Sequence, residues 1–314
     1  MERRSIPVVD LAPHLADAPG AREEAAAAVG HALEHVGFFS IVGHGIGWDT
    51  VEDIYRWCAR YHALPDETKR AHPMSAGTMG YIPLGGAQRG DRPPALNAAF
   101  FLGRPGSRRN RFPPESALPG FRRAVEDYYR AMERLCHRLL PLYALAAGMP
   151  ADHFDQFFDP ALATLRMSHY PPVAALDDQW GIDPHSDAGF MTLLPTNPVA
   201  GLQIRPDGDD WFDVEQEPRS FVVNAGDTLR RWSNDRFRST THRARNTSGI
   251  DRYAIPFFFD PRVDTVIECL PGCRRGDEPA RHAPLVYRDY LRGFMSDGYP
   301  QLALGADATV GTDR

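Results

Sequence analysis

The spacing of apolar and polar residues divides the chain into a mainly helical first half and a later region of short strands. Residues 21–36 are rich in Ala and Glu, with apolar positions at helical spacing. The same spacing predicts a second helix over 50–64 and a long one over 119–149, with a kink at Pro141. A final helical pattern covers 287–295. The long helix has the regular apolar stripe that is typical of a scaffold element.

From Ala163 onward the pattern changes to short apolar or alternating runs that are separated by turn residues. Phe221–Asn224 before Ala225-Gly226-Asp227 is one such run. The segment 74–114 is rich in Gly and Pro, which indicates loops and short strands. Helices followed by many short strands predict a mainly β fold with a helical flank, built on a sandwich or jelly-roll core.

Composition narrows the possible partners. A formal net charge of −6 disfavours nucleic acid, and no apolar run approaches the roughly 20 residues that a membrane span needs. We therefore expect a cytoplasmic protein with no nucleic-acid or membrane partner. The four cysteines are too scattered for a disulfide framework and are expected to be reduced, although Cys269-x-x-x-Cys273 leaves a metal contact open. The four arginines within 104–111 form either a solvated loop or a basic patch near a substrate entrance.

The strongest chemical signal is His185-Ser186-Asp187 followed by a lone His242. An imidazole and a carboxylate two positions apart on an extended strand point to the same face, so both can bind one ion. The chain between Asp187 and His242 (242 − 187 = 55) is long enough for the second imidazole to come from another strand. Two His and one carboxylate with open positions opposite are the expected ligands of a non-haem Fe(II) oxygenase. Other polar residues nearby are interpreted as structural or as supporting the site, namely His44, His169, Asn224 and Asp227.

Several further segments occur in a recognisable order around this triplet. They are Leu165–Pro172, Pro184–Leu194, Phe221–Asp227, Ser239–Arg243 and Arg252–Phe258, preceded near the start by Ile6–Leu11 and Gly37–Gly45. In order and approximate spacing they resemble the Fe(II)- and 2-oxoglutarate-dependent oxygenases of the isopenicillin N synthase-like family. The resemblance covers nearly the whole chain.

This resemblance implies a double-stranded β-helix with Fe(II) held inside its open end by His185, Asp187 and His242. It also implies 2-oxoglutarate and O2 as co-substrates, succinate and CO2 as products, and a small-molecule substrate from specialised metabolism. Related halogenases lack the carboxylate ligand. Because Asp187 is present, we expect hydroxylation, desaturation or ring formation instead.

The resemblance also assigns residues to 2-oxoglutarate. Arg252 stands where the family binds the distal carboxylate, and its planar guanidinium suits that group. Tyr170 and Ser168 occupy two further positions that can reach the co-substrate. The family usually continues Arg-x-Ser, whereas this chain has Ala254. The lost hydroxyl keeps open the alternative of an Fe(II) oxidase of the same fold that uses no oxoacid. A separate alternative is a non-catalytic protein that binds a small ligand, although the intact set of three metal ligands argues against it.

A largely aromatic substrate pocket is implied as well. By resemblance it is lined by Tyr81, Asn97, Phe101, Phe190, Phe257, Tyr290 and Phe294. Such a lining suits an apolar or ring-bearing molecule, with Asn97 or a nearby arginine as a polar contact. The alternative is that these aromatic residues only fill the core. Substrate identity, reaction outcome and oligomeric state stay open.

The expected organisation has four parts. Residues 1–118 form an N-terminal segment of helices and short strands, and 119–150 form the long scaffold helix. The double-stranded β-helix with the catalytic residues covers 151–285, and 286–314 hold a C-terminal helix and a tail that is expected to be mobile from Ala303.

Overall fold

The computed structural model describes residues 2–298 apart from 76, 89–90, 177, 275 and 277–278, so the predicted tail lies outside the described residues. Two sheets pack against each other. The larger has the order β2-β3-β11-β8-β14-β6-β5-β4, with β13 also paired to β6, and the smaller has the order β1-β10-β9-β12-β7. Side chains of both sheets share an apolar cluster that includes Phe38, Val222 and Ile204. The prediction of a mainly β fold with a jelly-roll core and a helical flank is confirmed.

Most strands of both sheets are short, and β6 is the longest among them. The larger sheet contains β2 (Val8–Asp10), β3 (Phe38–Val42), β4 (Tyr81–Ile82), β5 (Ala98–Leu102), β6 (Leu162–Tyr170), β8 (Met191–Pro195), β11 (Phe221–Ala225), β13 (Arg252–Ala254) and β14 (Phe257–Asp260). The smaller contains β1 (Arg3–Ser5), β7 (Ile182–His185), β9 (Leu202–Arg205), β10 (Phe212–Glu215) and β12 (Thr241–Ala244). A separate pair is formed by β15 (Val266–Ile267) and β16 (Leu285–Val286).

The four predicted helices are present within a few residues of their expected bounds. They are α2 (Ala21–His35), α3 (Trp48–His62), α5 (Phe121–Ala146, with Pro141 inside it) and α7 (Tyr287–Gly298). Shorter elements add α1 (Ala12–Leu15), α4 (Asp66–Arg70), α6 (Asp227–Trp232) and two 3-10 turns at Asp155–Phe157 and Pro271–Cys273. None of the helices in the described part of the chain is long and apolar enough to cross a membrane. All four cysteines are buried and free.

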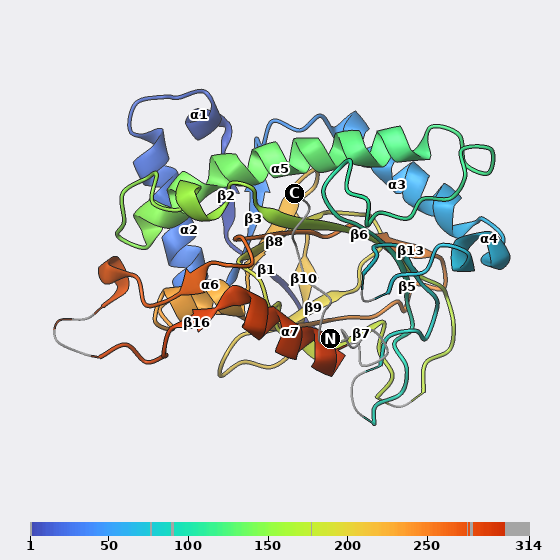
Figure 1. The fold of residues 1–314 in the computed structure, drawn as a ribbon. Helices are drawn as coiled ribbons and strands as arrows, with labels where there is room; N and C mark the ends of the chain where they lie inside the picture. The colour runs from blue at the N-terminus through green and yellow to red at the C-terminus, as the bar shows by residue number, and fades with distance from the viewer. Residues whose placement is uncertain are drawn as a thin grey trace.

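Helix α5 covers one face of the larger sheet, across which it lies in Figure 1. Alternation along β6 then separates two environments. Leu165 and Met167 join α5 in the main core, whereas Arg166, Ser168 and Tyr170 point to the opposite face, toward the interior between the two sheets. The polar residues of this long strand are therefore collected on the interior face.

The carboxylate of Asp260 ties the end of β14 to the loop after β7. Asp260 Oδ1 accepts a hydrogen bond from the backbone N–H of Phe190 at 2.7 Å. Burial raises the pKa of Asp260 to about 7, although the Phe190 bond acts in the opposite direction. An unfolded aspartate has a pKa of about 3.9, so the folded chain holds this proton more tightly than the unfolded chain does.

Because the pKa of Asp260 is higher in the folded chain than in the unfolded chain, Asp260 should make the protein less stable as pH rises from about 4 to about 7. Above that range its contribution should not change further. Asp260→Asn keeps an oxygen acceptor for Phe190 and removes the ionisation. We expect the variant to be more stable than the wild type at pH 8, by up to about 4 kcal/mol, and equally stable near pH 4. Thermal unfolding of both metal-free proteins across this pH range tests it. An equal pH dependence in the two proteins would contradict the assignment.

Candidate active site

Two imidazoles meet where β7 and β12 pair. In this antiparallel ladder His242 lies directly opposite His185, and the ring centroids are 4.3 Å apart. Strand β7 ends at His185, so Asp187 lies in the following loop and not on the strand itself. The expectation that His185 and Asp187 share one extended strand is therefore wrong, because the carboxylate reaches the imidazoles from the loop instead. His242 comes from another strand, as expected.

Hydrogen bonds orient both rings. His185 Nδ1 lies 2.7 Å from the carbonyl oxygen of Asp183, and His242 Nδ1 lies 3.2 Å from that of Thr240. A ring nitrogen facing a carbonyl must carry the proton, so the Nε2 atom of each ring presents its lone pair to a metal. Each Nε2 lies 3.7 Å from Asp187 Oδ1. Among the described residues, these three form the one group of His, Cys, Asp and Glu side chains whose ligand atoms all lie within 4.8 Å of one another.

Asp187 is prepared to act as an anion. Its Oδ2 accepts hydrogen bonds from Thr192 Oγ1 at 2.7 Å and Asn224 Nδ2 at 2.8 Å, so Oδ1 faces the imidazoles. Burial opposes ionisation, but the positive charges that His242 and His185 carry when protonated, together with the two hydrogen bonds, outweigh it and lower the pKa of Asp187 in the metal-free protein. When a metal binds, two neutral imidazole nitrogens and one carboxylate oxygen form a ligand set that fits a divalent transition metal.

The loop that carries Asp187 is fixed from outside by Asp227. The Asp227 backbone N–H donates to the Asp187 carbonyl at 2.7 Å, and its Oδ2 accepts from Ser186 Oγ and Tyr290 Oη, both at 3.0 Å. The predicted supporting roles of Asn224 and Asp227 match these contacts. Tyr290 therefore connects α7 to the metal-binding loop.

A second part of the site surrounds Arg252 on β13, opposite Tyr170 on β6. Arg252 is 2% exposed, and its guanidinium carbon lies 4.8 Å from the centroid of the Tyr170 ring. Its Nε donates to the Val199 carbonyl at 3.3 Å, while its Nη1 is enclosed without a partner among the described residues. Within the described part of the chain no carboxylate forms an ion pair with Arg252, so a buried cation is left for an anionic ligand.

Gly201 makes room for this arginine. Its φ of +152° favours glycine, and a Cβ there would lie 2.8 Å from Arg252 Nε and closer still to the Arg245 carbonyl oxygen. Any larger residue would displace the guanidinium. The sequence analysis did not single out Gly201, because its role depends on a contact that the sequence alone does not reveal.

The residue opposite Ala254 in the β13–β6 ladder is Ser168. Ser168 is fully buried, and its hydroxyl has no hydrogen-bond partner among the described residues. Side chains directly opposite in an antiparallel pair have Cβ atoms about 4.5–5.5 Å apart. The hydroxyl of Ser168 therefore lies next to the position where the family's serine would stand.

Three aromatic residues assigned to the substrate pocket instead fill the core. Phe190 is fully buried among Phe154 and Trp232, with centroid distances of 5.1 and 5.8 Å. Phe257 packs on Tyr129 at 5.0 Å, and Tyr81 belongs to the same main core cluster. The sequence suggested aromatic residues near the site, but alternation along the strands directs Tyr81 and Phe257 to the helix-covered face, and Phe190 packs into the same core from the loop before β8.

Three further residues assigned to the substrate pocket, Asn97, Phe101 and Phe294, do not belong to this core cluster. Phe101 is paired with Arg166 on the interior face, and Asn97 Oδ1 accepts a hydrogen bond from Arg166 Nη2 at 2.7 Å. Phe294 lies half-buried on α7 beyond Tyr290. The sequence analysis did not single out Thr192. The signal that could have found it is a polar residue within an otherwise apolar strand.

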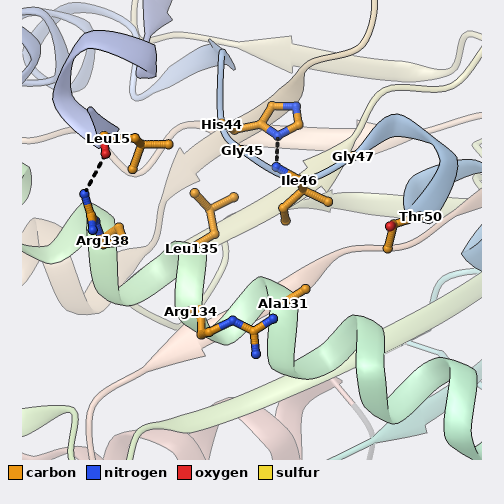
Figure 2. A pocket seen from close by; sticks show the side chains of 10 residues that line it. All are labelled: Leu15, His44, Gly45, Ile46, Gly47, Thr50, Ala131, Arg134, Leu135 and Arg138. Atoms are coloured by element: carbon orange, nitrogen blue, oxygen red, sulfur yellow. Dashed lines mark hydrogen bonds between the residues drawn. The ribbon is translucent and has the colours of Figure 1, made fainter. Parts of the chain in front are cut away.

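Other candidate groups lie outside the metal site. His169 Nε2 is 2.6 Å from Asp251 Oδ1, and the His169 ring stacks on Tyr253. His44 contacts the Arg219 carbonyl and lines a separate hollow of about 330 Å³ between α5 and the loop before α3. Figure 2 shows Arg134 and Arg138 of α5 on its other side. This hollow shares no residue with the metal-binding group.

Comparison with known proteins agrees with this geometry. Residues 161–261 match the family model of the 2OG-Fe(II) oxygenase superfamily, and 6–118 match that described as non-haem dioxygenase in morphine synthesis N-terminal. The 2-oxoglutarate-Fe(II) type oxidoreductase hxnY of Emericella nidulans is 32% identical over 93% of this chain and 90% of its own length. The chain belongs to the 2OG-Fe(II) oxygenase superfamily.

Solved structures of superfamily members share the fold. A full-length Neurospora crassa protein, solved in complex with alpha-KG and thymine, aligns with a TM-score of 0.84 and 26% identity over 91% of this chain and 95% of that chain. JOX2 in complex with 2OG, Fe and JA aligns with a TM-score of 0.76 and 25% identity over 96% of this chain and 88% of that chain. The protein is a non-haem Fe(II)- and 2-oxoglutarate-dependent dioxygenase, as the resemblance to the isopenicillin N synthase-like family implied.

The Thr192 hydroxyl should matter for metal affinity because it holds Asp187 Oδ2 and so directs Oδ1 inward. Loss of such a supporting hydrogen bond typically costs about 10- to 100-fold in metal affinity. We expect Thr192→Val to weaken Fe(II) binding by at least about tenfold in an anaerobic titration. Thr164→Val, in the same row of the sheet but without a bond to Asp187, is the matched control. Equal affinities of the two variants would contradict this role.

Proposed function

We propose that His185, Asp187 and His242 bind Fe(II), that Arg252, Tyr170 and Ser168 bind 2-oxoglutarate, and that the enzyme oxidises a largely apolar small molecule. The observation that carries the proposal is the convergence of two Nε2 atoms on Asp187 Oδ1, each at 3.7 Å. The hydrogen bonds on the far side of each ligand support this arrangement, because they fix ring tautomers and carboxylate orientation before any metal arrives.

When bound, Fe(II) and 2-oxoglutarate supply the oxidising chemistry, with O2 consumed and succinate and CO2 released. The protein holds the reactants in position and excludes water. Asp187, kept ionised by its neighbours, compensates part of the metal charge. Phe258, which is opposite Thr192 in the β14–β8 ladder, presents an apolar wall on the same face of the sheet.

Arg252 suits the distal carboxylate of 2-oxoglutarate. A buried guanidinium without an anionic partner costs several kcal/mol of stability in the free protein, and a carboxylate ligand offsets this cost through charge-assisted hydrogen bonds. Tyr170, across the ladder, holds the guanidinium plane from one side. The pair therefore places a positive charge beside an aromatic ring.

Ser168 supplies the hydroxyl that Ala254 lacks. Because Ser168 and Ala254 are opposite each other, a hydroxyl on either residue lies in the neighbourhood of Arg252. This arrangement favours 2-oxoglutarate use over the alternative of an oxidase without an oxoacid, which had rested on Ala254. The carboxylate of Asp187 favours hydroxylation, desaturation or ring formation, and relatives among fungal oxygenases favour a role in specialised metabolism.

Arg252 provides the first test. Arg252→Met should weaken 2-oxoglutarate binding at least about tenfold, because a charged hydrogen bond is worth about 1.5–3 kcal/mol. The charge-transfer band of the chelated oxoacid under anaerobic conditions measures this affinity. Arg252→Lys keeps the charge without the planar fork and should be intermediate. Unchanged affinity in Arg252→Met, with Fe(II) still bound, would contradict the assignment.

The hydroxyl exchange provides a second test. Ser168→Ala should weaken 2-oxoglutarate binding roughly tenfold by removing a hydrogen bond to a charged group. Adding Ala254→Ser to that variant should restore most of the affinity from the opposite strand. The same band reports all three proteins. If Ser168→Ala binds 2-oxoglutarate as the wild type does, or if the double variant shows no recovery, Ser168 does not replace the missing serine.

A further inference from the structure

A second arginine faces the interior between the sheets and has no role in the chemistry described so far. Arg166 is 7% exposed and lies on the same face of β6 as Ser168 and Tyr170. Its contacts are an uncharged amide, through Nη2 to Asn97 Oδ1 at 2.7 Å, and the Phe101 ring at 5.3 Å. Its Nε is enclosed without an acceptor among the described residues. Within that part of the chain, no carboxylate lies within ion-pair distance of this buried cation.

Asn97 holds the guanidinium in place instead of binding a ligand itself. Its Oδ1 accepts from Arg166, while its Nδ2 donates to the Gly181 carbonyl at 2.5 Å. Both polar atoms of Asn97 are therefore engaged. Nη1 of Arg166 forms no hydrogen bond with any described residue. Unlike Nε, it is not fully enclosed by the protein, so it is the part of the guanidinium that a ligand can reach.

Arg166 is too far from Arg252 to share the carboxylate of one 2-oxoglutarate. Arg252 is opposite Tyr170, which lies four residues along β6 from Arg166, a separation of about 13 Å at strand rise. Arg166 lies two strands from Thr192, roughly 12 Å away by strand spacing and rise. A small molecule can extend over such a distance from an anchored end to a reacting carbon near the metal.

The neighbours of Arg166 describe the rest of such a ligand. Phe101 belongs to a buried apolar cluster with Ile82 and Ala99, which Met74 and Met79 extend. Toward the metal, Phe258 offers a further apolar surface on the same face of the sheet. An anionic end group on an apolar body matches one accessible cationic nitrogen set among apolar and aromatic side chains.

We propose that Arg166, positioned by Asn97, anchors a carboxylate of the substrate, so that the enzyme acts on small organic acids with an apolar body. The inference rests on the proposed function, because it assumes that Fe(II) and 2-oxoglutarate occupy the adjoining site. An incoming carboxylate provides the counter-charge that Arg166 lacks. Neutral analogues of the same shape leave that charge unpaired and bind more weakly.

Matched acids and amides test the anchor. The probes are benzoate, phenylacetate and 3-phenylpropanoate, each paired with its primary amide, added anaerobically to the protein loaded with Fe(II) and 2-oxoglutarate. Binding is read from the change that the probe causes in the charge-transfer band and from the thermal midpoint. We expect at least one acid to bind about tenfold or more tightly than its amide.

Variants separate the anchor from the general site. Arg166→Gln should retain the charge-transfer band with 2-oxoglutarate but bind each acid no better than its amide, and Arg166→Lys should recover part of the preference. Because the acid–amide comparison uses the wild type, it decides the question even if Arg166→Gln does not fold. No preference for any acid in wild type that forms the band, or an unchanged preference in Arg166→Gln, would overturn the anchor alone. A wild-type protein that forms no band would overturn the proposed function and the anchor with it.

Discussion

The pairing of β12 with β7 is the constraint on which the site depends. It sets His242 opposite His185 and turns both Nε2 atoms toward Asp187. Each imidazole ring is oriented by a hydrogen bond to the carbonyl group two residues earlier in the chain. The backbone conformation therefore sets the direction of each ring. A shift of one residue in this register would turn one imidazole away from the other. Loop contacts from Asp227 then complete the arrangement by fixing the carboxylate.

A second constraint is the handling of buried charge between the sheets. Arg252 and Arg166 are both nearly inaccessible, yet neither has a carboxylate partner within the described residues. Such groups lower the stability of the free protein, which a chain under selection for stability alone would avoid. Their cost is offset when anions bind. The interior between the sheets thus holds two cationic positions in addition to the metal-binding group, with apolar side chains around Arg166.

The sequence was most informative where a local rule applies. Helical periodicity located α2, α3, α5 and α7 within a few residues, and the His185, Asp187 and His242 triplet identified the metal-binding group. It was least informative about which face a side chain occupies. Phe257 lies next to an interior-facing residue yet points into the core, because successive side chains along a strand point to opposite faces.

Long-range contacts could not be predicted for a different reason. Three contacts depend on the register between separate segments of the chain. Ser168 lies opposite Ala254, Thr192 donates to Asp187, and Gly201 leaves space for Arg252. A single sequence carries no direct record of register. The departure at Ala254 was visible as a missing hydroxyl, but its compensation became visible only once the strands were paired.

The most direct measurement is a crystal structure of the anaerobic complex with Fe(II) and 2-oxoglutarate, with iron located by its anomalous scattering. The account predicts one iron peak within bonding distance of His185 Nε2, His242 Nε2 and Asp187 Oδ1, with the distal carboxylate of 2-oxoglutarate on Arg252. An iron peak that lacks any one of these three ligands, or a 2-oxoglutarate bound away from Arg252, would contradict it.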